Sequence, residues 1–194
     1  MKALLTPLAL AAALTGCALS PTTQTTLTPR QEVQEFTFEG RFALRARLPG
    51  HPEQSGNGRL TWQHTPRGEQ ILLANPLGYG IAEITMTSDG AVLRTADGET
   101  REAADPAELI EQVTGQRLPL DRFAAWLIGR PGPRDSVRED AQGRPVRLSD
   151  ANADWQIDYA YAEPSPDALP QRITLRQANR LELRLRAENW TTSP

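Results

Sequence analysis

The clearest pattern in the chain is an alternation of apolar and other residues that runs from Phe36 to Leu48. One face of this stretch is formed by Phe36, Phe38, Gly40, Phe42, Leu44, Ala46 and Leu48. A period of two predicts a single β-strand with one apolar face. Strands usually run about five or six residues, so a longer one suits a strongly curved sheet or a barrel wall. We expect the strand to bend at Gly40.

Shorter alternating stretches follow, separated by turns rich in glycine, proline and aspartate. Their apolar positions fall within residues 60–64, 71–74, 82–86, 91–94, 155–161, 173–175 and 181–185. Short turns between neighbouring strands predict an antiparallel meander. Residues 134–154 are expected to be irregular, apart from a short strand at Val146 to Leu148.

Between residues 105 and 128 the apolar period changes to 3.6, which predicts two short helices. Asp105 suits the N-cap of the first helix, Pro106 its first position and Gly115 its end. The second helix is expected over residues 120–128. The chain is therefore predicted to be mainly β with helices, and the apolar stripes of the helices must cover part of the sheet.

The segment Asn75-Pro76-Leu77-Gly78 joins two apolar strands and has the residue types of a tight turn. Leu77 should lie near a hairpin tip, where the turn itself needs no leucine. Its side chain either folds back as a plug or is presented to another apolar surface. The pattern by itself leaves both alternatives open.

The N-terminal residues have the organisation of an export signal. The apolar run from Ala3 to Leu14 has the length of a signal-peptide core and is too short to span a bilayer as a stable helix. It ends in Leu14-Thr15-Gly16-Cys17, which resembles a lipobox, and Cys17 is the only cysteine. We expect residues 1–16 to be removed and Cys17 to be lipidated. Cleavage within residues 11–13 would instead leave a free thiol.

The remaining chain divides into a tether and one domain. Residues 17–35 are expected to form the lipidated N-terminus and a flexible tether, because prolines and small polar residues dominate this stretch. Residues 36–190 then form a single folded domain, which is long enough to bury a hydrophobic core.

Charge and motif content narrow the range of functions. With 21 basic and 24 acidic residues the net charge is −3, and the arginines are scattered along the sequence. This argues against nucleic acid and against a purely electrostatic membrane partner. The two histidines, His51 and His64, lack zinc-ligand spacing, and no serine lies in a GxSxG motif. Residues 150–154 open like a calcium loop, but Trp155 and Tyr161 replace its glycine and glutamate. We expect no enzymatic activity, cofactor or metal.

Taken together, the motifs of this chain resemble those of the outer-membrane lipoprotein receptor family LolB. They are the lipobox, Glu39-Gly40-Arg41-Phe42-Ala43-Leu44, Gly58-Arg59-Leu60-Thr61-Trp62, Asn75-Pro76-Leu77-Gly78, Thr114-Gly115 with Leu118-Pro119-Leu120, Trp126-Leu127-Ile128-Gly129-Arg130-Pro131, and Trp155 with Tyr159. The resemblance covers essentially the whole chain in order.

The resemblance implies an incomplete antiparallel β-barrel closed by a short-helix lid over a hydrophobic cavity, a fold shared with the periplasmic carrier LolA. It implies a receptor on the periplasmic face of the outer membrane that accepts acylated lipoproteins from LolA and inserts them into the inner leaflet without nucleotide. Ala18, which stands where inner-membrane retention signals have aspartate, is consistent with that location. By matched position, Leu77 corresponds to a loop leucine associated with membrane insertion. Expected partners are LolA, lipoprotein cargo and outer-membrane lipid, and we expect a monomer.

Periodicity cannot separate a solid core from a lined cavity. The positions that alternation assigns to the acyl-chain cavity are Phe38, Phe42, Leu44, Trp62, Ile84, Trp126, Trp155, Ile157, Tyr159 and Leu183. The competing hypothesis is a lipid-anchored scaffold of an envelope complex, with a closed core and a tip that binds a protein partner.

Overall fold

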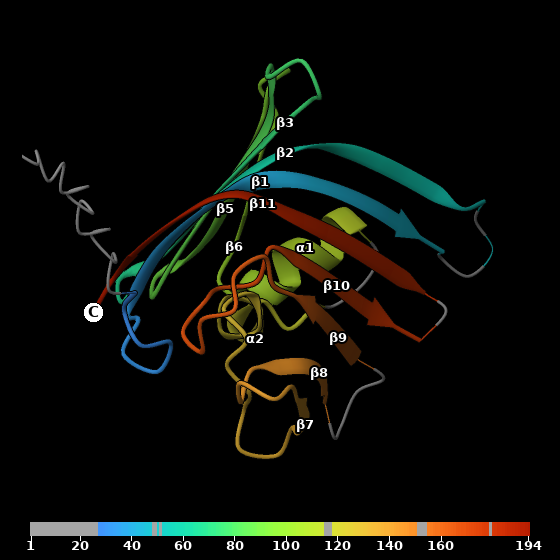
Figure 1. Ribbon diagram of the computed structural model, residues 1–194. Coiled ribbons are helices and arrows are strands. Elements are labelled where there is room, and N and C mark those ends of the chain that lie inside the picture. Colours follow the sequence, from blue (N-terminus) through green and yellow to red (C-terminus); the bar gives the residue numbers. More distant parts are fainter. Residues whose placement is uncertain (1–26, 48–49, 51, 115–117, 151–154, 179) are drawn as a thin grey trace, which may run out of the picture.

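A strongly curved antiparallel sheet with two helices against its concave face forms the domain (Figure 1). The computed structural model describes residues 27–47, 50, 52–114, 118–150, 155–178 and 180–194. The elements are β1 (Glu35–Ala46), β2 (Gln54–Thr65), β3 (Gly68–Ala74), β4 (Gly80–Thr87), β5 (Gly90–Thr95), β6 (Thr100–Ala103), α1 (Pro106–Thr114), α2 (Leu120–Leu127), β7 (Ser136–Glu139), β8 (Pro145–Ser149), β9 (Trp155–Ala160), β10 (Arg172–Gln177) and β11 (Leu181–Ser193).

The strand order is β6-β5-β4-β3-β2-β1-β11-β10-β9-β8-β7. Each half of the sheet is a meander, and the halves join where the first strand, β1, pairs with the last, β11, so that Glu35 lies opposite Ser193. The sheet is open, with β6 and β7 as its edges. The predicted mainly β fold with an incomplete antiparallel barrel and two short helices is thus confirmed.

β1 is the long strand expected from the alternation, and its register against β11 shifts between Glu39 and Gly40. A Cβ on Gly40 would lie 2.2 Å from the carbonyl oxygen of Arg186. The backbones therefore approach at the bulge more closely than any side chain would permit. Gly40 marks the bend for this reason.

Helix α1 begins as predicted, because the Asp105 carboxylate accepts a hydrogen bond of 2.9 Å from the Ala107 amide. Helix α2 ends one residue earlier than expected, at Leu127. Gly129 then adopts a left-handed φ of 71°, and the Arg130 amide donates to the Ala125 carbonyl at 2.9 Å. This is a glycine-terminated helix end of the usual kind.

Two short strands lie where sequence periodicity predicted none. β6 pairs with β5 before α1, and β7 pairs with β8 at the opposite edge. β7 falls within residues expected to be irregular, whereas β8 contains the predicted strand at Val146 to Leu148. All four residues of β7 are exposed, so its side chains carry no alternation of buried and exposed positions.

The last residues before β1 pack against the domain. Val33 is buried. A guanidinium nitrogen of Arg130 donates hydrogen bonds to two backbone carbonyls of this segment, that of Arg30 and, at 2.8 Å, that of Val33. Arg30 in turn donates to the carbonyl of Pro166. This part of the expected tether is held on the fold, whereas the signal region and Cys17 lie outside the described residues.

Candidate functional site

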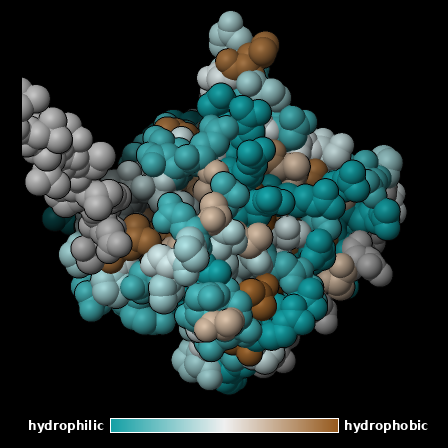
Figure 2. All heavy atoms as spheres, in the orientation of Figure 1, coloured by the Kyte–Doolittle hydropathy of each residue, from teal (hydrophilic) through white to brown (hydrophobic). Residues whose placement is uncertain are grey.

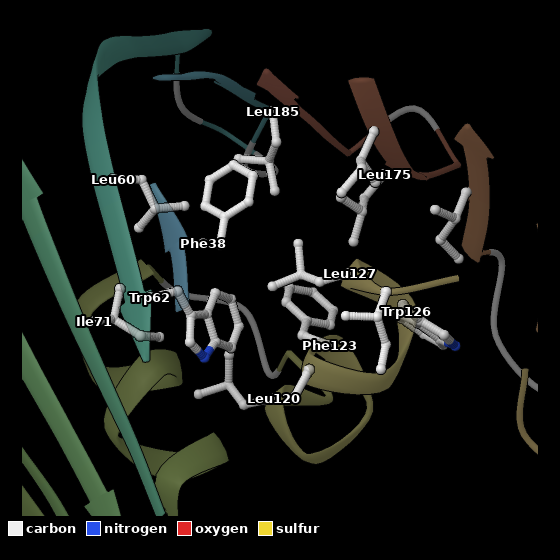
Figure 3. Close-up of a cluster of buried hydrophobic side chains, with 14 of the residues drawn as sticks. Phe38, Leu60, Trp62, Ile71, Leu120, Phe123, Trp126, Leu127, Leu175 and Leu185 are labelled. Carbon is white, nitrogen blue, oxygen red and sulfur yellow. The ribbon is translucent and has the colours of Figure 1, made fainter. Parts of the chain in front are cut away.

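The concave face of the sheet is apolar and is covered by the helices. Side chains from β1, β2, β3, β10 and β11 point toward α2, and those of α2 point back toward the sheet (Figure 3). The alternation that makes one face of each strand apolar is therefore used to build a single two-sided cluster.

The ten residues assigned to an acyl-chain cavity all belong to this cluster or pack against it. Seven are buried: Phe38, Trp62, Ile84, Trp126, Trp155, Ile157 and Tyr159. Phe42, Leu44 and Leu183 are only partly buried and pack at its margin. In this conformation the side chains of sheet and helices bury one another, so the seven buried residues have core packing.

The partly buried residues mark an apolar margin of the cluster. Leu44 lies opposite Leu183 of β11 on one side and opposite Gly56 of β2 on the other. A Cβ built on Gly56 would meet no atom within 4 Å, so there is open space beside this strand. An apolar chain that entered the cluster from here would first meet Phe42, Leu44 and Leu183.

Helix α2 supplies the aromatic part of the cluster. The Phe123 ring lies 5.6 Å from Trp126 and 5.3 Å from Trp155, and Trp126 lies 5.9 Å from Trp155, between ring centroids. These separations are typical of stabilising aromatic pairs. Leu127, fully buried beside them, completes the face that α2 turns toward the sheet.

Polar contacts hold α2 in this position. The Tyr159 hydroxyl donates to the Trp126 carbonyl at 2.9 Å, and the Trp126 indole donates to Asp135 at 3.2 Å. Arg122 forms ion pairs with both Asp135 and Asp150, and its guanidinium lies 4.7 Å from the Trp126 ring. Sequence periodicity did not indicate this network, because α2, Asp135, Asp150 and β9 are separate segments whose polar side chains follow no motif.

The network also sets the charge state of its members. Burial alone would raise the pKa of Asp135, but hydrogen bonds from the Gly132 amide, Arg122 and Trp126 hold it below its usual value. Burial raises the pKa of Tyr159, so the hydroxyl stays protonated and remains a donor to α2.

The second part of the site is the tip of the β3–β4 hairpin, which rises from the sheet on the side away from the helices (Figure 1). Leu77 is 83% exposed and Tyr79 71% exposed. Figure 2 shows the resulting apolar group at the end of the projection. Leu77 therefore does not fold back as a plug, which decides between the two alternatives that the turn pattern left open.

Asn75 organises the tip. The side-chain oxygen of Asn75 accepts hydrogen bonds from the backbone amides of Leu77 at 2.9 Å and Tyr79 at 3.1 Å. The backbone amide of Asn75 donates to the Tyr79 carbonyl at 2.8 Å. Gly78 has a φ of 94°, which favours glycine. The loop thus holds a large apolar side chain in solvent by internal hydrogen bonds, without packing it on the domain.

Of the other residues considered as candidates for catalysis or metal binding, His64 lies in a structural position. His64 stacks on Phe36 with 5.0 Å between ring centroids and contacts Glu69 at 2.6 Å. His51 and residues 151–154 of the calcium-like segment are outside the described residues, as are Cys17 and Ala18. Among the residues that are described, no group of three or more histidine, cysteine, aspartate or glutamate side chains could hold a metal. No helix in that part of the chain is long and apolar enough to cross a membrane.

Comparison with known proteins agrees with the resemblance seen in the motifs. The family model described as outer membrane lipoprotein LolB matches residues 34–190. A protein from Dechloromonas aromatica named outer-membrane lipoprotein LolB is 46% identical over 181 residues, covering 93% of each chain. Proteins of the same name from Thiobacillus denitrificans and Azoarcus sp. are each 32% identical, covering 100% and 92% of this chain and 100% and 90% of their own lengths.

A solved structure, a LolA superfamily protein from Nitrosomonas europaea, aligns with 81% of this chain and 86% of its own at 10% identity and a TM-score of 0.45. The family is shown by the sequence relatives, whose similarity extends over nearly their whole length. This chain belongs to the outer-membrane lipoprotein LolB family.

Proposed function

We propose that this protein is an outer-membrane lipoprotein receptor, anchored through Cys17, that accepts acylated lipoproteins from the periplasmic carrier LolA and releases them into the inner leaflet of the outer membrane. The observation that supports this most directly is the exposed Leu77, held in solvent on an apolar tip by the Asn75 loop. The names of the relatives support the location.

Acyl chains cannot cross an aqueous space uncovered, because exposing each methylene group to water costs about 0.8 kcal/mol of free energy. The concave face provides a cover of matching chemistry. Because its side chains already pack against α2, a cargo chain enters this face by displacing the helix, and the aromatic cluster closes again after release. We assign the entry to the margin formed by Phe42, Leu44 and Leu183, and the deeper binding positions to the seven buried residues.

Release is assigned to the other side of the sheet. Inserting the Leu77 side chain among lipid tails contributes about 2 kcal/mol to the free energy of membrane binding. This suffices for a shallow and reversible contact. Transfer without nucleotide then requires only that the membrane bind acyl chains more strongly than the concave face does. The receptor acts as a monomer in this scheme, since one chain carries both the cover and the tip.

The test separates uptake from release. A form with Cys17→Ala is mixed with LolA loaded with a lipoprotein, and cargo transfer is measured by pull-down, after which liposomes are added. Leu77→Glu is expected to take up cargo nearly as well as wild type but to release it into liposomes at least tenfold more slowly. Val137→Glu, which places the same charge on an exposed apolar position of β7, is expected to behave as wild type.

Equal loss of uptake and release in Leu77→Glu would contradict this division of roles. Failure of any cargo to move from a competent carrier to the folded wild-type protein would favour the scaffold hypothesis instead.

A further inference from the structure

Four arginines lie side by side across the middle of the sheet. Arg59 of β2 lies opposite Arg41 of β1, Arg41 opposite Arg186 of β11, and Arg186 opposite Arg172 of β10. All four side chains are exposed, and they alternate with residues that face the helices, so they occupy the convex face. Neighbouring strands are about 4.8 Å apart, so this arginine row spans about 15 Å.

The positive charge of the arginine row is poorly compensated. Glu188 accepts from Arg41 at 2.7 Å and from Arg59 at a longer 3.5 Å. Arg186 also interacts electrostatically with Glu188, but within the described part of the chain neither Arg172 nor Arg186 forms an ion pair with a carboxylate, so one glutamate faces four arginines. Like charges directly opposite one another in a sheet are destabilising, so the arrangement lowers the stability of the fold.

The basic residues next to the row show the contrast. Arg176 binds both Asp158 at 2.6 Å and Glu182 at 2.9 Å. Arg184 also pairs with Glu182, and Arg147 with Asp158, each at 2.6 Å. Compensation by cross-strand pairs is thus available on this face, and the arginine row lacks it.

The row begins where the hairpin leaves the sheet. Arg59 lies opposite Ala74, the last residue of β3 before the loop that carries Leu77 and Tyr79. Both the hairpin and the convex face point away from the helices (Figure 1). The hairpin exposes Leu77 and Tyr79 at its tip and Leu72 and Ile81 on its strands, and the guanidinium groups begin at its base. Apolar and aromatic side chains suit the hydrocarbon region and interface of a bilayer, and basic side chains suit its phosphates.

We propose that the arginine row binds the phosphate groups of an anionic lipid surface and orients the domain on the membrane while the hairpin tip inserts. The inference rests on the proposed function, in which Leu77 enters the bilayer. A single shallow apolar contact gives marginal membrane binding, and a basic patch beside it supplies the second contact that stable docking needs. Arginine suits this role because its planar fork binds phosphate oxygens in a bidentate manner.

The test uses the chain from residue 17 onward with Cys17→Ala, so that no acyl anchor masks the contact and the whole described domain is retained. Binding is measured by co-sedimentation with vesicles of phosphatidylcholine alone or of phosphatidylcholine with phosphatidylglycerol. Arg172→Gln/Arg186→Gln removes two charges that take part in no described ion pair. Arg67→Gln/Arg138→Gln removes the same charge from the β2–β3 turn and from β7, both outside the row.

Wild type is expected to prefer the anionic vesicles and to lose that preference as salt is raised. Arg172→Gln/Arg186→Gln is expected to bind anionic vesicles about tenfold more weakly while its binding to neutral vesicles is unchanged, and the Arg67/Arg138 variant to differ from wild type by less than about twofold. Removal of like charges should not lower the midpoint of unfolding, which checks that the variant is folded. The single variants Arg172→Gln and Arg186→Gln are measured alongside it, each with a smaller loss expected.

Equal binding of the two double variants to anionic vesicles would overturn the proposal. So would a loss of cargo uptake from the carrier in the absence of vesicles, because the row would then contact an acidic protein and not lipid. The outcome is separable from that of the proposed function, since no cargo is present in the sedimentation assay. If Leu77→Glu releases cargo normally while the row variant loses anionic binding, the release mechanism fails and the lipid contact stands.

Discussion

At the scale of single residues, Asp135 is the most connected polar side chain under helix α2. Its carboxylate is almost fully buried and accepts from Arg122, from the Trp126 indole and, at 2.8 Å, from the Gly132 amide. Because the hydrogen bonds outweigh the effect of burial, its pKa lies below the usual range. The folded state therefore favours the carboxylate over the protonated acid.

We predict that Asp135→Asn lowers the free energy of unfolding by about 2 kcal/mol at pH 7, since a buried charged hydrogen-bond acceptor is lost. An unfolded aspartate has a pKa of about 3.9, so the stabilisation is complete above about pH 4 and is lost as the pH falls through the lower folded value. Urea unfolding between pH 2.5 and pH 7 should show a shallower acid loss in Asp135→Asn than in wild type. Asp89→Asn, in the exposed β4–β5 turn, is the control, and an equal acid slope in both variants would refute the assignment.

At the scale of elements, the β1–β11 pair determines the curvature of the sheet. These strands are the longest partners in the fold, and they join two meanders that are separate in the sequence. The bulge opposite Gly40, in which Glu188 is the extra residue of β11, lets this strand pair bend while the apolar residues of β1 stay on the concave face. Curvature in turn leaves room beneath the sheet for α1 and α2.

Gly40→Ala is predicted to destabilise the domain by about 3 kcal/mol, because the new methyl group would overlap the Arg186 carbonyl and force the two central strands apart. Gly56→Ala is the matched control. It places the same methyl group on the neighbouring strand, where a Cβ meets no atom within 4 Å, and its effect on stability is expected to be within about 0.5 kcal/mol. Thermal or urea unfolding of both proteins measures the difference, and similar losses would show that close approach at Gly40 is not limiting.

At the scale of the whole molecule, the sheet separates two surfaces of different chemistry. Its concave side is apolar and occupied by α2, whereas its convex side carries the arginine row and the projecting tip. Opening of the helices and contact with a membrane can therefore occur on opposite sides without steric conflict. Under the proposed function, variants on one side should alter uptake and variants on the other should alter release.

Tyr159→Phe tests this separation. It removes the hydrogen bond to the Trp126 carbonyl but keeps the ring, so α2 should open more readily by about 1 kcal/mol. We expect about fivefold faster hydrogen exchange in α2 and faster cargo uptake, with release into liposomes unchanged. Tyr161→Phe removes a comparable 2.8 Å bond, to Pro145, and should leave α2 exchange unaltered. Unchanged α2 exchange in Tyr159→Phe would exclude a role for this bond in closing the site.

Much of the secondary structure followed from periodicity, because one apolar face per element suffices to specify a strand or a helix. The long β1, the bend at Gly40 and the Asp105 cap are examples in which the local pattern and the local structure have the same cause. β6 and β7 were not predicted, because they are short edge strands whose residues are not buried and so show no alternation of apolar and polar positions.

For the candidate site too, local features were predicted and contacts between distant segments were not. All ten residues assigned to the cavity lie on or beside one cluster, nine of them on strands and Trp126 on α2, since the apolar face of a strand or a helix is a local property. Whether those residues are packed or open depends on how closely α2 approaches the sheet, which involves contacts such as Tyr159 with Trp126 that are distant in the sequence. The ion pair of Arg122 with Asp135 was not predicted either, because it joins two separate segments of the chain.

The sequence by itself determined the apolar faces, the two helices, the turn at Leu77 and membership of the LolB family, because these depend on residue type and spacing. Only the tertiary structure decided that Leu77 is exposed, that α2 covers the concave face, and that arginines scattered along the chain meet in one row. Those three properties depend on strand register and on packing between distant segments, and no local pattern encodes which residues of four separate strands will lie opposite one another.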